Sequence, residues 1–371
     1  MTKPESYLFA GGGSGGHLTP GLALAAEWRA MHADCRIAFV GSARPIECQM
    51  VQEAGYEHRV LTVESTQLLR TQPLRFAWRN WCAYRQAKRL LQAERPRAVI
   101  GLGGFASVPL VFAAIRHAVP TLILEQNTIP GRASRFLSRR AAAVCVTFPQ
   151  SQSRLSKQAK VFVTGNPVRR EIAALAMSDA GPRTSTGNNL LVLGGSQGAS
   201  GLNQAVQRMV VESPQRWRAL RFIHQTGVDR CQEIRDFYAK LELDHEVEPF
   251  FTDMARRYRE STLVISRAGA TTLAELACAG CPAVLVPYPH AADNHQFHNA
   301  EHFRQAAAAR IVLQTAQPEE TARQLSQTIT ELLDDRPSTE AMARRMRSLA
   351  EPEAAANVVQ VLQTLIAGRI K

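Results

Sequence analysis

Short apolar runs alternate with longer amphipathic stretches along the first half of the chain. In order, these runs occupy residues 6–11, 36–41, 98–104, 120–126 and 141–148. Helix-like stretches such as 22–31 and 83–94 lie between them. Strands and helices that alternate in this way form a parallel sheet wound with helices, so the first half is predicted to be an α/β domain.

The same alternation begins again after a pause at Gly165-Asn166-Pro167 and a polar run at 179–189. Six more strand-like runs follow, at 190–195, 221–227, 247–251, 262–269, 282–288 and 309–315. We therefore expect two domains, 1–163 and 164–352. A last helical piece spans about 353–371, and the pattern alone does not decide on which domain it packs.

Each series opens with a glycine-rich turn directly after its first strand. The turns are 11–16, just before His17, and 194–198. Glycine lets the backbone approach a ligand closely, at an entropic cost. In open α/β sheets, ligands bind beyond the carboxyl ends of the strands, where such turns lie. The sequence thus predicts two Rossmann-like domains whose parallel sheets face each other across a cleft.

The first turn lacks the residues that a dinucleotide site or a P-loop needs. The second strand ends in Gly41 with no carboxylate to hold a ribose, and His17 stands where a P-loop carries its lysine. A nicotinamide or ATP enzyme is therefore disfavoured. The second turn favours a diphosphate, because Ser196 and the N–H groups after Gly195 would lie at a helix N-terminus. Arg169 can add a fork-shaped cationic contact.

Neither a metal nor a cofactor is expected. The chain has no Asp-x-Asp motif, and Cys278 and Cys281 form a C-x-x-C without a second pair. The histidines of 289–300 lack a metal-binding spacing. The seven scattered cysteines fit the reduced thiols of a cytosolic protein. The longest apolar runs are strand-sized, so no transmembrane helix is expected.

Six ordered motifs resemble one known family. They are GGGSGGHLTPGL, GLGGFASVP, EQNTIPGRAS, TGNPVR, GGSQGASGLN and the run 266–300. Over essentially the whole chain they closely resemble the MurG family of bacterial cell-wall N-acetylglucosaminyltransferases. The resemblance implies a GT-B fold whose C-terminal helix returns to the first domain.

The resemblance also implies an activity. The reaction would be an inverting, metal-independent transfer of GlcNAc from UDP-GlcNAc to the 4-hydroxyl of the muramoyl-pentapeptide of lipid I. In lipid I this muramoyl-pentapeptide is linked to a polyprenyl diphosphate, and its conversion to lipid II belongs to peptidoglycan synthesis. The protein would act as a peripheral enzyme on the cytoplasmic face of the inner membrane.

Roles for individual residues follow from the same resemblance. In the second domain, Arg169 and Ser196 would hold the diphosphate, and Phe251 would line the uracil pocket. Gln296 would contact the sugar, and Glu275 would accept the ribose hydroxyls. The segment that meets the phosphates and ribose would be Ala270, Thr271, Thr272, Leu273, Ala274 and Glu275. Judged by its residues alone, such a Glu is usually a solvated or capped residue, and the ribose role requires the turn at 269–272 to bring a nucleotide close.

The first domain would supply further contacts to the donor. Ser14, Gly15 and Gly16 would close on the sugar and diphosphate, and Asn127 would reach the GlcNAc. In two places this chain departs from its relatives. Phe105 stands where relatives often carry Tyr, and Leu124 where many carry His.

The chemistry requires a base for the acceptor hydroxyl. His17 is one candidate, because a histidine titrates near working pH; alternatively, it only hydrogen-bonds the turn or a phosphate. Glu125 is the competing base, unless its role is to hold the turn that follows it.

The net positive charge lies entirely in the first half. Up to Val163 there are 21 Lys and Arg against 9 Asp and Glu, and the remainder has 23 of each. Leu74, Trp78 and Trp81 recur at helical spacing within the basic segment 68–91. Either these side chains are core, or they enter a bilayer while cations meet anionic headgroups. We expect the membrane surface; nucleic acid is disfavoured because no recognition motif accompanies the charge.

Overall fold

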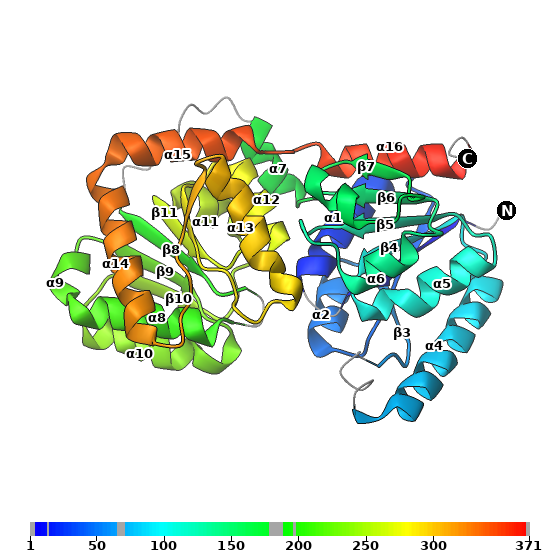
Figure 1. Ribbon diagram of the computed structural model, residues 1–371, viewed down its shortest axis with the longest axis horizontal. Coiled ribbons are helices and arrows are strands. Elements are labelled where there is room, and N and C mark those ends of the chain that lie inside the picture. Colours follow the sequence, from blue (N-terminus) through cyan, green and yellow to red (C-terminus); the bar gives the residue numbers. More distant parts are fainter. Residues whose placement is uncertain (1–3, 13–14, 65–70, 178–187, 196–197, 369–371) are drawn as a thin grey trace. The chain divides into compact units, whose positions relative to one another are not determined.

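The computed structural model describes residues 4–12, 15–64, 71–177, 188–195 and 198–368 (Figure 1). Ser14 and Ser196 lie outside these residues. The chain divides into two compact units, 1–169 together with 353–371, and 170–352. The division therefore falls between Arg169 and Arg170, a little beyond the expected boundary at 163/164.

The first unit is built on a seven-stranded sheet with the order β3-β2-β1-β4-β5-β6-β7. Every neighbouring pair is parallel. The strands are β1 Ser6–Gly11, β2 Arg36–Gly41, β3 Glu57–Val60, β4 Ala98–Gly103, β5 Thr121–Glu125, β6 Ala143–Val146 and β7 Val161–Val163. The winding reverses between β1 and β4, and the crevice at such a switch point is where α/β sheets bind ligands.

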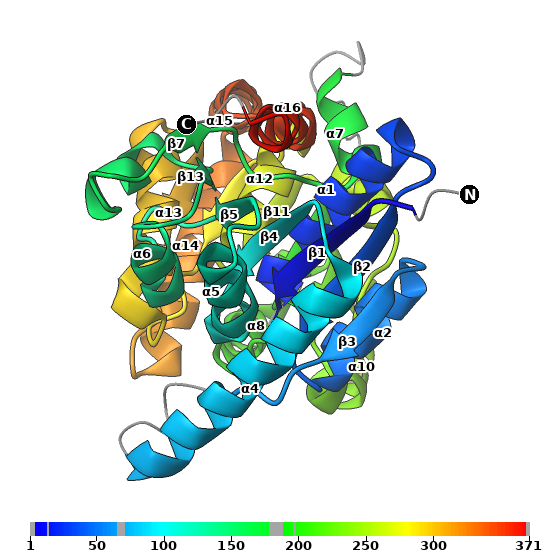
Figure 2. The ribbon, with the colours of Figure 1, turned by 90° about the vertical axis from the view of Figure 1, so that its right-hand side faces the viewer.

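Helices cover both faces of this sheet (Figure 2). They are α1 Gly15–Met31, α2 Pro45–Glu53, α4 Pro73–Glu94, α5 Val108–Arg116, α6 Arg132–Leu137 and α16 Ala354–Ile366, with the short helices η1 Phe105–Ser107 and η2 Pro149–Arg154. Side chains of a strand alternate between faces. Tyr7 and Phe9 accordingly pack with α1 and α16, whereas Leu8 and Ala10 pack with α4 and α5.

The last helix completes the core of the first unit. Its apolar stripe, which includes Val358 and Leu362, is buried in the same cluster as Leu24 and Trp28 of α1. Three- and four-residue spacing places such side chains on one face of a helix. The apolar face of α16 therefore packs against the apolar face of α1.

The second unit repeats the architecture with a parallel six-stranded sheet of order β10-β9-β8-β11-β12-β13. Its strands are β8 Asn189–Leu193, β9 Arg221–Gln225, β10 His245–Glu248, β11 Leu263–Ser266, β12 Ala283–Leu285 and β13 Ala309–Ile311. Its helices are α7 Arg170–Met177, α8 Ser200–Glu212, α9 Pro214–Trp217, α10 Cys231–Lys240, α11 Met254–Glu260, α12 Ala270–Ala279, α13 His295–Gln305, α14 Pro318–Asp334 and α15 Arg336–Ser348, with η3 Val228–Arg230 and η4 Ala292–Asn294. The prediction of two Rossmann-like α/β domains is confirmed.

Candidate functional site

The first glycine-rich turn lies at the switch point of the first sheet, directly after β1. Gly12 has a φ of +153°, and a Cβ built on it would lie 2.9 Å from the Cδ atom of Glu47. A larger residue would therefore have to displace a buried carboxylate. The helix α1 begins at Gly15, so Gly15, Gly16 and His17 form its first turn rather than part of a loop.

Glu47 is a buried acid beneath this turn that the motifs did not reveal. Its side chain is 1% exposed and comes from the first turn of α2. Its carboxylate accepts the Ser42 N–H at 2.8 Å and the Ser42 hydroxyl at 3.0 Å. The carboxylate thus ties the end of β2 to the first turn of α2. Burial lowers the pKa of the neighbouring His58, although Glu47 itself opposes that shift.

His17 is held from two sides at the start of α1. Its Nδ1 lies 2.9 Å from Oε1 of Gln126, and the Nε2 of Gln126 donates to the Leu102 carbonyl at 3.1 Å. A Cβ on Gly103 would lie 3.0 Å from the same Nδ1, so the ring packs directly on the backbone after β4. Sequence reasoning did not single out Gln126, although it stands between Glu125 and Asn127, which were singled out.

Glu125 faces the turn that follows β5. One carboxylate oxygen accepts the Asn127 backbone N–H at 2.9 Å, and the other accepts the Gly131 N–H at 3.0 Å. The side chain is buried. Both oxygens therefore serve the loop, which favours the structural role of Glu125 over that of a base. Leu124 is part of the core of the first unit.

The second glycine-rich turn follows β8 and leads into α8. A Cβ on Gly198, whose φ is +73°, would lie 2.6 Å from the Thr226 carbonyl oxygen, so the turn is packed closely against β9. Beneath it, the buried His224 bridges Asn203 of α8 at 3.2 Å and the Tyr238 hydroxyl at 3.0 Å. Burial lowers the pKa of His224 to about 3 and raises that of Tyr238. This neutral network fixes the start of α8.

The expected phosphate and ribose segment forms the first two turns of α12. The helix begins directly after β11, its N-cap Gly269 carries no side-chain cap, and first-turn N–H groups lack intrahelical acceptors. Leu273 is fully buried, so its side chain belongs to the core. Glu275 is 6% exposed and accepts the Tyr258 hydroxyl at 2.9 Å. The carboxylate is thus held in place rather than solvated.

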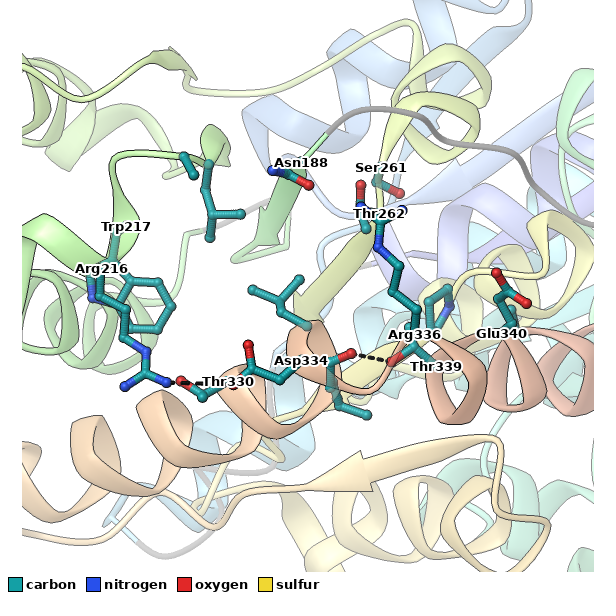
Figure 3. A pocket seen from close by; sticks show the side chains of 16 residues that line it. Asn188, Arg216, Trp217, Ser261, Thr262, Thr330, Asp334, Arg336, Thr339 and Glu340 are labelled. Carbon is teal, nitrogen blue, oxygen red and sulfur yellow. Dashed lines mark hydrogen bonds and ion pairs between the residues drawn. The ribbon is translucent and has the colours of Figure 1, made fainter.

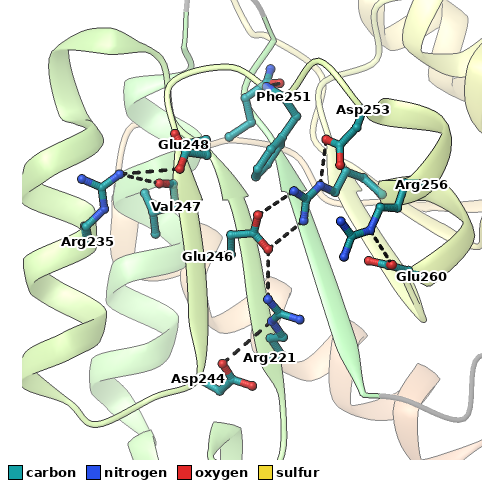
Figure 4. A network of polar contacts seen from close by, with 12 residues as sticks. Arg221, Arg235, Asp244, Glu246, Val247, Glu248, Phe251, Asp253, Arg256 and Glu260 are labelled. Atoms are coloured by element: carbon teal, nitrogen blue, oxygen red, sulfur yellow. Dashed lines mark hydrogen bonds and ion pairs between the residues drawn. The ribbon is translucent and has the colours of Figure 1, made fainter.

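Phe251 lies within a polar network beyond β10 (Figure 4). Its ring is 2% exposed and packs under the Arg257 guanidinium, 4.6 Å from the ring centroid. Arg257 is held in turn by Glu246, at 2.6 Å and 2.7 Å, and by Asp253 at 3.0 Å. The Phe251 ring is therefore covered by Arg257, and the Phe251 N–H donates to Gln225 at 3.1 Å.

Three further polar side chains that bear on the donor site are those of Gln296, Arg169 and Arg267. Gln296 accepts the Tyr288 N–H at 2.9 Å and so ties the segment after β12 to α13. Arg169 is the last residue of the first unit. Arg267, which sequence reasoning missed, follows β11 and donates to the Val286 carbonyl at 3.0 Å; burial lowers its pKa to about 10. Its guanidinium also donates to Gln314 at 2.6 Å, so the cation lies between the segments that follow β12 and β13.

A cavity of about 320 Å³ opens at the opposite edge of the second sheet (Figure 3). Asn188 and Thr262, which line it, directly precede β8 and β11, so the cavity lies at the amino ends of the strands. An ion pair between Arg216 and Asp334, 3.9 Å long, borders it. It is therefore separate from the glycine-rich turn and from the start of α12.

The first unit exposes an aromatic face on α4. Leu74, Trp78 and Trp81 are 86%, 63% and 48% exposed, so the alternative that they are core is excluded. The two indole rings lie 5.4 Å apart, and the Arg85 guanidinium lies over Trp81. Next to them is an apolar cavity of about 640 Å³, to which Phe112 and other aromatic side chains of α4, α5 and α6 contribute.

The sequence predicted neither a metal site nor a membrane-spanning helix. Within them, no group of three or more His, Cys, Asp or Glu side chains is arranged to hold a metal ion. Burial raises the pKa of the Cys278 thiol to about 11, which keeps it protonated. Over the same part of the chain, no helix is long and apolar enough to cross a membrane.

Comparison with known proteins defines the class. The glycosyltransferase family 28 N-terminal domain matches residues 7–146, and the glycosyltransferase family 28 C-terminal domain matches residues 189–358. A protein from Syntrophotalea carbinolica is 37% identical over 367 residues, covering 96% of this chain and 98% of that protein. One from Hahella chejuensis is 37% identical over 361 residues, covering 96% and 97%. The chain belongs to glycosyltransferase family 28, and within it to the MurG proteins.

Both relatives carry the name UDP-N-acetylglucosamine--N-acetylmuramyl-(pentapeptide) pyrophosphoryl-undecaprenol N-acetylglucosamine transferase. Among solved structures, Acinetobacter baumannii MurG matches with a TM-score of 0.76 and 29% identity, covering 97% of this chain and 100% of that one. UDP-GlcNAc 2-epimerase from Neisseria meningitidis matches with a TM-score of 0.68 at 14% identity, which is a likeness of fold.

Proposed function

We infer that this protein transfers GlcNAc from UDP-GlcNAc to the 4-hydroxyl of the muramoyl-pentapeptide of lipid I and so produces lipid II. The observation that carries this inference is the 37% identity, over nearly the whole chain, to transferases named for that reaction. Glycine-rich turns at the switch points of both sheets supply the binding geometry that a sugar nucleotide requires.

The second unit binds the donor in this proposal. The uncapped start of α12 and the turn before α8 offer N–H groups to the diphosphate, as helix N-termini do for anions. Ser196 adds a hydroxyl, and Gln296 contacts the sugar. Arg169, the last residue of the first unit, adds a cation. Glu275, already oriented by Tyr258, accepts the ribose hydroxyls.

The first unit binds the acceptor and supplies the base. His17 takes the proton of the acceptor 4-hydroxyl as that oxygen forms its bond to the anomeric carbon of GlcNAc. The bond from this carbon to the diphosphate breaks on the opposite face, and UDP leaves with the electron pair, so the configuration inverts. Helix N-termini and Arg169 stabilise the charge that develops on the diphosphate. Glu125 holds the turn that carries Asn127.

The first unit also attaches the enzyme to the membrane surface in this proposal. Residues 1–169 and 353–371 hold 24 Lys and Arg against 10 Asp and Glu, whereas 170–352 hold 20 against 22. The exposed Leu74, Trp78 and Trp81 lie among the basic residues of α4. Attachment would be peripheral, on the cytoplasmic face of the inner membrane, where lipid I and anionic headgroups meet the protein.

A transfer assay tests the activity. The purified protein is incubated with radiolabelled UDP-GlcNAc and a lipid I analogue, and matched reactions contain labelled UDP-glucose or lack the acceptor. We expect label in the lipid fraction only with UDP-GlcNAc and the acceptor together. Equal transfer from UDP-glucose, or no transfer at all, would reject the proposed donor and acceptor pair.

A further inference from the structure

The side chain of Gln126 connects β4 to the first turn of α1. It is 2% exposed, and both ends of its amide are engaged, with Nε2 donating to the Leu102 carbonyl at 3.1 Å and Oε1 lying 2.9 Å from Nδ1 of His17. The contact joins residues 109 positions apart, so it depends on the tertiary fold.

The chemistry of these contacts determines the tautomer of His17. A carbonyl oxygen only accepts hydrogen bonds, so the amide nitrogen of Gln126 must face Leu102 and its oxygen must face the imidazole. An amide oxygen also only accepts, so the proton must lie on Nδ1 of His17. In the neutral ring, Nε2 then carries the lone pair. A base for the acceptor hydroxyl requires such an unprotonated nitrogen.

We propose that Gln126 is a positioning residue that keeps His17 in the Nδ1–H tautomer and so leaves Nε2 ready to accept a proton. The catalytic part of this proposal rests on the proposed function of His17. A neutral amide suits the task because it orients the ring without adding a negative charge that would retain the proton. The neighbouring carboxyl group of Glu125 does not take this place, because it accepts hydrogen bonds from Asn127 and Gly131 instead.

Other ionisable side chains on the neighbouring elements have their own contacts. On α2 and just before it, Glu47 accepts two hydrogen bonds from Ser42, and the Arg44 guanidinium lies 5.9 Å from the centroid of the Phe105 ring. Glu125 serves the turn after β5. Substitution of Gln126 by a carboxylate would therefore introduce a new charge at Nδ1 of His17.

The tautomer can be measured directly by ¹⁵N NMR on protein with labelled histidine, at a pH where the ring is neutral. The His17 signals are assigned by their loss in His17→Ala. We expect a protonated Nδ1 and an unprotonated Nε2 in the wild-type protein, and a mixture of tautomers in Gln126→Leu. A protonated Nε2 in the wild type, or an unchanged tautomer in Gln126→Leu, would overturn the proposal without reference to activity.

Kinetics test whether the tautomer serves the reaction. Loss of a hydrogen bond worth about 0.5–1.5 kcal/mol lowers kcat about 2–12-fold in Gln126→Leu, with KM for UDP-GlcNAc unchanged. In Gln126→Glu, the acid limb of the kcat/KM profile moves up by about 1–3 pH units, because a carboxylate stabilises the imidazolium. A purely structural role would not produce that shift.

A double-mutant cycle separates the two levels of the proposal. In a His17→Ala background, Gln126→Leu should leave the residual kcat unchanged, because its effect passes through the imidazole. If the full loss persists there, Gln126 acts on the fold and the proposal fails. If His17→Ala alone retains near-normal kcat, the proposed base is wrong, and the NMR result still decides the tautomer.

Discussion

Glu275 offers the sharpest test of the donor site, because its contacts inside the protein can be separated from those it would make to a ligand. In Glu275→Ala, two ribose hydroxyls lose their acceptor, which costs about 1–3 kcal/mol and raises the Kd for UDP about 5–150-fold. The same change removes the acceptor of the buried Tyr258 hydroxyl, which destabilises the protein by about 1–3 kcal/mol. Glu275→Ala would thus lower both the stability of the protein and its affinity for UDP.

Two further variants resolve this overlap. Tyr258→Phe removes the internal hydrogen bond and keeps the carboxylate, so it should lower stability while the Kd for UDP changes less than about 2-fold. Glu275→Gln keeps an acceptor for Tyr258 but loses the charge, so it should weaken UDP binding with little change in stability. Calorimetric titration with UDP gives the affinities, and thermal unfolding gives the stabilities. If Glu275→Ala and Glu275→Gln fold and bind UDP as tightly as the wild type, Glu275 is not part of the donor site.

Three other predictions follow from the same structure. His17→Ala should lower kcat by about 10²–10⁴ while UDP affinity stays within about 2-fold. Steady-state kinetics and titration with UDP measure the two quantities, and a normal kcat in this variant would contradict the role of His17 as the base. Trp78→Ala combined with Trp81→Ala should abolish the salt-resistant part of binding to anionic vesicles in a sedimentation assay, because apolar insertion, unlike the attraction of basic residues, is not screened. Unchanged vesicle binding of the folded double variant at high salt would rule out α4 as the anchor. The folded pKa of His224, about 3, lies below its ordinary 6.5, so between these values the unfolded state binds more protons and stability decreases as the pH is lowered. This group alone should cost about 2 kcal/mol between pH 7 and pH 5, and chemical denaturation of His224→Gln should lack that part of the loss.

The sequence pattern predicted most strands because buried parallel strands read as continuous apolar runs. It missed β3, Glu57–Val60, which lies at the edge of the sheet and in which only Val60 is apolar. It also placed β10 at 247–251, whereas the strand is His245–Glu248 and ends before Pro249, which has no N–H to donate to the ladder. Edge strands lack the burial on both faces that makes a central strand recognisable.

Those parts of the candidate site that depend on residues close together in the sequence could be predicted. Glycine-rich turns after the first strands predicted the ligand-binding edge of each sheet, and helical spacing placed Leu74, Trp78 and Trp81 on one face. Periodicity cannot show whether another element covers that face, and only the fold reveals that it is exposed. The contacts of Glu47 and Gln126 join separate strands and helices, so no local pattern could reveal them.

The central claim is the transfer of GlcNAc to lipid I without a metal, and the structure of the product tests it most directly. The reaction is run with UDP-GlcNAc and a lipid I analogue in the presence of a chelator, and the product is analysed by mass spectrometry and NMR. We predict one added GlcNAc per acceptor, joined β-1→4 to the muramoyl residue, at a rate that the chelator does not change. An α-linked product, a linkage to another hydroxyl, or loss of turnover with the chelator would contradict the account.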